Sequence, residues 1–256
     1  MTALLRLLVV LVILAQLPRS VAHAHGGRLP FLFWGNFPRF AIPCQKAIGR
    51  AAALCAARSA QARFRCTIGQ DTSCSATDLE SQREAILRVA LNLIDRFCSD
   101  RAAVQLGFLG TIEAQSDIAN MCTTVNRDLS FVFEPTDEPS PTGDCTRSVS
   151  GAVVRLLRSG TMIWEELFNR VALKGGGAKG RTLITRARAR ISLQQQKLAN
   201  VIRRHCTDES VTAIYGTTTS ELLNRAARLT ECVAGAAYVQ DAIHCDTAQS
   251  GGSLSP

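Results

Sequence analysis

The cysteines constrain the fold of this chain more than any other feature of its sequence. There are ten of them in 256 residues, and no two form a Cys-x-x-Cys pair. This spacing excludes a thioredoxin-type redox motif, a zinc ribbon and haem attachment through Cys-x-x-Cys-His. In an exported chain, an even number of cysteines instead predicts that all of them form disulfides.

The first 24 residues have the pattern of a secretory signal. Arg6 precedes a short apolar run from Leu7 to Ala15, and an Ala-His-Ala cleavage motif ends at Ala24. A retained anchor is the less favoured alternative, because the run is far shorter than the about 20 residues that span a bilayer. We expect cleavage after Ala24 or, alternatively, Ala22, export to the periplasm or extracellular space, and no transmembrane segment in the mature protein.

Apolar periodicity predicts an all-α fold. Cys44, Cys55 and Cys66 are eleven residues apart, within a stripe of apolar residues spaced by three and four, so they share one face of a helix over residues 43–66. A second helix is expected to be capped by Thr77 or Asp78 and to end at Phe97. The remaining helices are expected over residues 111–129, 146–173, 182–205 and 220–244.

A weak internal repeat indicates two related units. The sequence Arg-Phe-Cys-Ser-Asp at residues 96–100 recurs as Arg-His-Cys-Thr-Asp at residues 204–208. Between the copies, residues 134–144 contain three prolines and four acids, which is typical of an exposed linker. We expect two disulfide-stapled helical-hairpin units of about three helices each. The expected segments are an aromatic-rich arm at 25–43, unit 1 at 44–133, the Pro-rich acidic linker at 134–144, unit 2 at 145–245 and a flexible tail at 246–256.

Cysteine spacing also predicts the disulfide pairing. If the second helix of a hairpin runs antiparallel to the first, its end meets the start of the first, which favours a Cys44–Cys98 bond. Cys66 and Cys74 have no counterparts in unit 2, as expected of mutual partners at the tip of the first hairpin. Cys55 is then left to reach the third helix. The complete expected set is Cys44–Cys98, Cys55–Cys122, Cys66–Cys74, Cys145–Cys206 and Cys232–Cys245.

Basic residues are concentrated in unit 2. Ten Lys and Arg residues, and no acid, lie between Glu166 and Asp208. Such a cluster can hold a polyanion, such as an anionic glycan, a glycolipid or nucleic acid. The plain alternative is a solvated helix face, since Arg186, Arg188 and Arg190 do not share one side of a helix. The expected polyanion-binding residues are Arg170, Lys174, Lys179, Arg181, Arg186, Arg190, Lys197, Arg203 and Arg204.

An aromatic strip follows the expected signal, at residues 29–40. It could dock on another protein or lie at a lipid surface as a peripheral contact. The favoured alternative is that the strip packs across its own domain. The candidate docking residues are Phe31, Phe33, Trp34, Phe37 and Phe40.

Support for metal binding or catalysis is weak. Cleavage after Ala24 would leave His25 at the amino terminus as a weak candidate copper ligand, and no cofactor is expected. The sequence lacks Gly-x-Ser-x-Gly, His-Glu-x-x-His and a phosphate-binding glycine loop. We expect a non-catalytic binding or structural protein of the cell envelope or extracellular space that contacts a polyanion through unit 2. The alternatives are lipid-surface binding through the arm, or a secreted hydrolase whose site is assembled from distant residues.

Overall fold

The computed structural model describes residues 37–68, 74–133, 143–174 and 178–238. Within these ranges the chain is helical and contains no strand, which confirms the all-α class. The helices are α2 (Ile42–Thr67), α3 (Ala76–Phe97), α4 (Asp100–Gln105), α5 (Thr111–Asp128), α6 (Ser130–Phe133), α7 (Gly143–Lys174), α8 (Ala178–Ile202), α9 (Asp208–Tyr215) and α10 (Thr219–Tyr238).

The helix starts differ in detail from those expected. Helix α3 is capped by Ser75 rather than by Thr77 or Asp78. The Ser75 hydroxyl accepts from the Asp78 N–H at 3.1 Å, and the Asp78 carboxylate accepts from the Ser75 N–H at 2.9 Å, which forms a capping box. Helix α7 begins at Gly143, inside the segment that we expected to be linker. The expected starts were therefore wrong by a few residues at these two helices.

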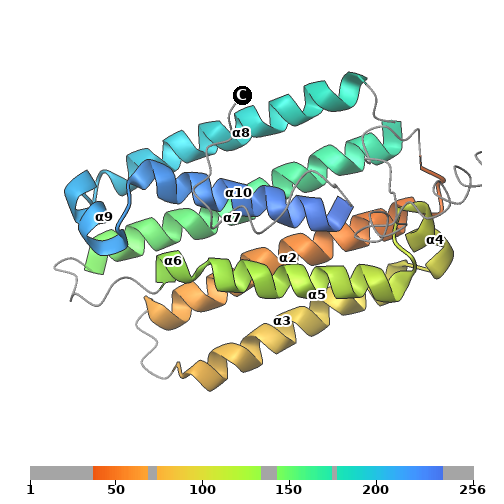
Figure 1. Ribbon diagram of the computed structural model, residues 1–256, viewed down its shortest axis with the longest axis horizontal. Helices are drawn as coiled ribbons and strands as arrows, with labels where there is room; N and C mark the ends of the chain where they lie inside the picture. The colour runs from red at the N-terminus through yellow and green to blue at the C-terminus, as the bar shows by residue number, and fades with distance from the viewer. Residues whose placement is uncertain (1–36, 69–73, 134–142, 175–177, 239–256) are drawn as a thin grey trace, which may run out of the picture.

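The long helices form two layers (Figure 1). Helices α3, α2, α7 and α8 contact one another in that order, so they lie side by side in one layer. Helices α5 and α10 pack across one side of this layer, with α5 on α2 and α3 and α10 on α2, α7 and α8. No helix in the described ranges covers the opposite side of the layer.

Small residues allow the two layers to approach closely at two points. A Cβ atom added to Gly49 of α2 would lie 2.0 Å from the hydroxyl of Tyr238 on α10. A Cβ added to Gly160 of α7 would lie 2.6 Å from a methyl carbon of Thr230, also on α10. The ring of Tyr238 stacks on Phe168 at a centroid distance of 4.2 Å. The position of α10 is therefore determined by contacts to both central helices.

Four disulfides join the described helices, and each pair is one that the cysteine spacing predicts. They are Cys44–Cys98, Cys55–Cys122, Cys66–Cys74 and Cys145–Cys206. Cys232 is also disulfide-bonded, but its expected partner Cys245 lies outside the described residues. The bond between Cys55 and Cys122 ties the central helix α2 to α5 in the second layer.

Candidate polyanion-binding surface

Residues 167–207 contain no acid, but acids of neighbouring helices contact them in the structure. Glu166 of α7 accepts a hydrogen bond from Arg190 of α8 at 2.8 Å and also pairs with Arg170. Glu231 of α10 accepts from two nitrogens of Arg188, at 3.0 and 3.2 Å. Neighbouring helices therefore neutralise part of the expected cluster. In particular, the expected contacts Arg170 and Arg190 already share a carboxylate.

Several residues of the cluster remain exposed. Arg186 and Lys197 of α8 lie on the same side of the helix as Arg190, at spacings of four and seven, and neither pairs with an acid in the described part of the chain. Arg203 and Arg204 are exposed just after the end of α8. The side chains of the other three expected contacts, Lys174, Lys179 and Arg181, lie outside the described residues.

A second set of basic residues, which the sequence analysis missed, lies on α2 and α7. These residues lie on the exposed side of each helix, and the remaining sides of both helices are buried against their neighbours. None of them forms an ion pair with another described residue. They are Lys46, Arg50, Arg58 and Arg65 of α2 and Arg147, Arg155 and Arg158 of α7.

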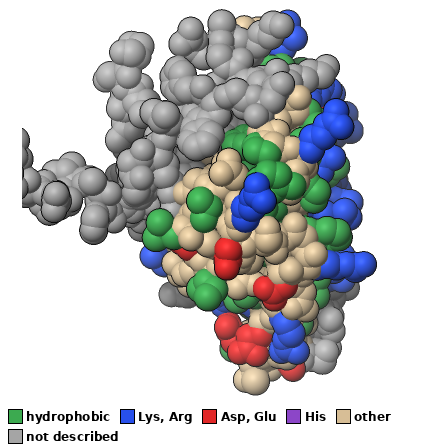
Figure 2. Space-filling model, turned by 90° about the vertical axis from the view of Figure 1, so that its right-hand side faces the viewer, with side chains coloured by type: hydrophobic (Ala, Val, Ile, Leu, Met, Phe, Trp, Pro, Cys, Tyr) green, Lys and Arg blue, Asp and Glu red, His purple; other side chains and the backbone are tan. Residues whose placement is uncertain are grey.

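Apart from Arg203, both sets belong to the side of the layer that α5 and α10 leave uncovered. We call this side the open face and define it by the basic residues of α2 and α7 given above, together with Arg186, Arg190, Lys197 and Arg204. In Figure 2, which views the bundle from the end where α4 lies, Lys and Arg side chains run along one edge of the molecule. The open face thus joins basic residues from three helices that are distant in sequence.

Three arginines of α5 and α10, by contrast, are paired with carboxylates. Arg228 contacts Glu221 at 2.8 Å, and Arg225 contacts the same carboxylate at 3.7 Å. Arg127 of α5 lies 3.2 Å from the Asp128 carboxylate. Each of these guanidinium groups thus has a nearby counter-charge, whereas the basic residues of the open face, apart from Arg190, form no ion pair with another described residue.

Two acids border the open face, and their environments differ. Hydrogen bonding to Arg190, followed by the charges of Arg190 and Arg170, lowers the pKa of Glu166. Burial raises the pKa of Glu165, and the charge of Arg50 opposes this effect. One carboxylate is therefore shared by two arginines, whereas the other lies half-buried near a third.

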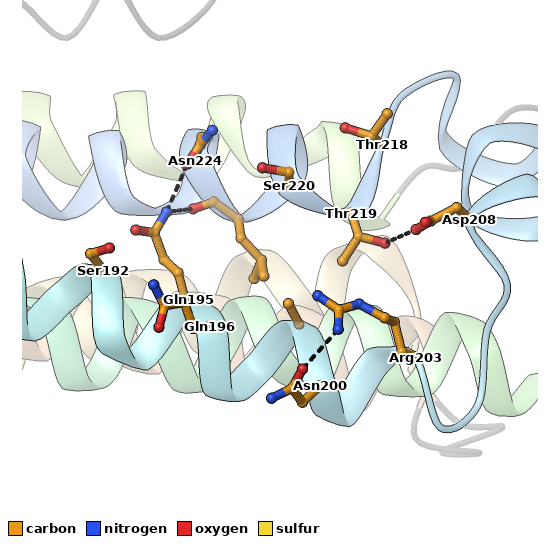
Figure 3. Close-up of a pocket in the computed structure, with 12 residues that line it drawn as sticks. Ser192, Gln195, Gln196, Asn200, Arg203, Asp208, Thr218, Thr219, Ser220 and Asn224 are labelled. Carbon is orange, nitrogen blue, oxygen red and sulfur yellow. Dashed lines mark hydrogen bonds between the residues drawn. The ribbon is translucent and has the colours of Figure 1, made fainter.

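One groove lies on each side of α8. The groove between α7 and α8 has a volume of about 610 Å³ and contains Glu165, Glu166 and Arg190 together with the exposed apolar side chains of Met162 and Leu193. The groove between α8 and α10 has a volume of about 740 Å³ and is lined mainly by side-chain amides and hydroxyls (Figure 3). The sequence analysis predicted neither groove, since each one depends on the distance between two helices.

The aromatic arm is divided by the structure. Phe37 is buried in the core, with 7% of its surface exposed, so it is not free to dock on a partner. Phe40 is 44% exposed, and the guanidinium of Arg101 lies 4.8 Å from the centre of its ring. The other three candidate docking residues, Phe31, Phe33 and Trp34, lie outside the described residues.

In the described ranges, no group of three or more His, Cys, Asp or Glu residues is placed to hold a metal ion. The weak candidate His25 is outside these ranges. Among the described helices, none is both long enough and apolar enough to cross a membrane. Comparisons with protein-family models, with curated proteins and with solved structures found no match.

Proposed function

We propose that this protein is an exported, non-catalytic binding protein that holds polyanions on the open face. The observation that carries the proposal is the asymmetry of ion pairing. Arg127, Arg188 and Arg228 contact carboxylates, whereas Arg155 and Arg158 are exposed and form no ion pair with another described residue, and Arg50 has only a longer-range interaction with Glu165. Unpaired guanidinium groups can form bidentate contacts with phosphate, sulfate or carboxylate groups.

The distribution of charge favours a chain-like ligand over a small anion. The basic residues of the open face are spread along three long helices rather than gathered in one pocket. A polymer can contact many of them at once and release its condensed counterions, which strengthens binding at low salt. An anionic glycan, the polysaccharide part of a glycolipid and a nucleic acid all meet this requirement.

Export is part of the proposal. Disulfides are maintained in oxidising compartments, so the four bonds between described residues support a periplasmic or extracellular location. The expected signal at residues 1–24 provides a route to that location. A rigid, cross-linked bundle also keeps the basic residues of different helices at constant separations.

We further propose that the bundle arose by duplication of a unit of four helices. The order of long, long, short and long helices in α2–α5 is repeated in α7–α10. In each half a disulfide joins the start of the first helix to the segment that follows the second, as Cys44–Cys98 and Cys145–Cys206. This correspondence supports the two units, with the second beginning at the start of α7.

Binding of the mature, disulfide-bonded protein to immobilised heparin at two salt concentrations tests the proposed function. The variant Arg50→Ala/Arg155→Ala/Arg158→Ala removes charge from the open face. We expect its affinity to fall about tenfold or more, and its log K against log salt slope to become shallower by about 2 to 3.

The matched control, Arg127→Ala/Arg188→Ala/Arg228→Ala, removes the same charge from paired positions. We expect this control to bind within about twofold of the unmodified protein, because those guanidinium groups already contact carboxylates. Equal weakening by both variants would assign the effect to net charge alone. That result, or binding independent of salt, would overturn the proposal.

A further inference from the structure

We propose that the groove between α8 and α10 binds the sugar rings of an anionic polysaccharide, an inference that rests on the proposed function and names the class of polyanion. The groove lies on the opposite flank of α8 from Arg190, so it adjoins the open face without belonging to it. A polymer seated in the groove could cross the exposed surface of α8 and reach Lys197 and Arg204 on the other flank.

The lining of the groove suits a ligand rich in hydroxyl groups. Eight of its twelve residues have uncharged side-chain amides or hydroxyls, two are charged and two are apolar. Amides and hydroxyls both donate and accept hydrogen bonds, as sugar hydroxyls do. Lipid chains and apolar peptide side chains would find few partners there. The polar residues are Ser192, Gln195, Gln196, Asn200, Thr218, Thr219, Ser220 and Asn224, with Arg203 and Asp208 as the charged pair.

Internal hydrogen bonds hold part of this lining in place (Figure 3). Gln195 donates from Nε2 to the Leu223 carbonyl at 3.2 Å and to Asn224 Oδ1 at 2.9 Å. These bonds leave Gln195 Oε1 as an acceptor and Asn224 Nδ2 as a donor for a ligand. Because the two amides are ordered before binding, a ligand would lose less conformational entropy in contacting them.

Hydrogen bonds of the same kind orient the charged end of the groove. Arg203 donates from Nη1 to Asn200 Oδ1 at 2.9 Å, which leaves Asn200 Nδ2 and other guanidinium nitrogens available. Thr219 donates to Asp208 Oδ1 at 3.3 Å, so Asp208 Oδ2 remains as an acceptor for a hydroxyl. Arg203 can therefore contact a sulfate or carboxylate on a sugar whose hydroxyls bind the amides. A polyphosphate lacks such hydroxyls and would use only the open face.

The test compares two polyanions, heparin as a sulfated polysaccharide and inorganic polyphosphate as a polyanion without sugars. The groove variant Ser192→Ala/Gln196→Ala removes two exposed polar side chains that line the groove. We expect heparin affinity to fall about tenfold, as the loss of two hydrogen bonds implies, while polyphosphate affinity stays within about twofold. A second variant, Ser192→Trp, should block the groove and weaken heparin binding in the same selective way.

The matched control is Ser116→Ala/Asn120→Ala, which removes two exposed polar side chains from α5 and should leave both affinities unchanged. Circular dichroism and urea unfolding establish that all variants are folded. Unchanged heparin binding by the groove variants, or equal weakening for both polyanions, overturns this inference but leaves the proposed function standing if the open-face variant still loses affinity. Failure of the unmodified protein to bind either polyanion overturns both.

Discussion

Gly49 shows how one residue determines the separation of two helices. The Tyr238 hydroxyl occupies the space that a Cβ atom of residue 49 would need, and Tyr238 itself is buried against Phe168. Burial, together with the charge of Glu165, raises the pKa of Tyr238, so this phenol stays neutral in the folded protein. A larger residue at position 49 would force the Tyr238 ring, or α10 with it, to shift away from α2.

We predict that Gly49→Ala destabilises the protein by about 1 to 3 kcal/mol, the usual cost of overpacking a core. Urea unfolding with intact disulfides measures the change. Gly143→Ala is the control, because a Cβ at residue 143 meets nothing within 4 Å, and we expect a change within about 0.5 kcal/mol there. Equal costs for the two substitutions would show that the close approach to Tyr238 is not a packing constraint.

Asp100 is a second residue whose effect follows from its contacts. It is the first residue of α4, and its carboxylate accepts from the Thr111 N–H at 2.9 Å and from the Thr111 hydroxyl at 2.7 Å, at the start of α5. These hydrogen bonds lower the pKa of Asp100, the backbone bond more than the hydroxyl bond. The ionised carboxylate of Asp100 thus links the start of α4 to the start of α5.

This lowered pKa predicts a dependence of stability on pH. The carboxyl of Asp100 is more acidic in the folded state than in the unfolded state. Its contribution to the stability of the fold is therefore present above its pKa in the unfolded state and is lost as the pH falls through its pKa in the folded state. We expect carbon NMR of Asp100 to show titration below the ordinary aspartate value of about 3.9, and Thr111→Val to shift the pKa upward. Titration at or above the ordinary value would contradict the contacts described.

At the scale of the helices, length decided what could be predicted. The long helices α2, α3, α5, α7, α8 and α10 each repeat an apolar stripe over several turns, and the sequence pattern predicts all six. The short helices α4 and α9 have 6 and 8 residues, so the apolar pattern does not repeat within them, and the sequence analysis predicted neither. Their hydroxyl caps, Ser99 and Thr207, were the available sequence signal.

The disulfides provide a prediction at the same scale. The Cys55–Cys122 bond joins helices across a separation of 67 residues, whereas Cys66–Cys74 closes a separation of 8. Restriction of the unfolded chain predicts a loss of about 4 kcal/mol for Cys55→Ala/Cys122→Ala and about 2.5 kcal/mol for Cys66→Ala/Cys74→Ala. Urea unfolding of both variants measures the two losses. The reverse order would show that native packing, rather than loop length, dominates.

Over the whole molecule, the arrangement of charge departs most from the sequence-based prediction. The ten basic residues between Glu166 and Asp208 formed the most basic part of the sequence, but the structure places Glu166 and Glu231 against three of them. In contrast, the sequence analysis overlooked the basic residues of α2, a helix that contains no acid. Arg50 and Arg155 contribute to one surface only because α2 and α7 are neighbours in the layer.

The amino-acid sequence by itself determined the helical class, the long helices and the partners of eight cysteines. Helical periodicity is a local property, and the pairing follows from the positions of cysteines along antiparallel helices. Only the tertiary structure decided which charges are neutralised and which surface they form. Whether Arg188 and Arg190 contact acids depends on the distances of α10 and α7 from α8, and packing between the helices sets those distances.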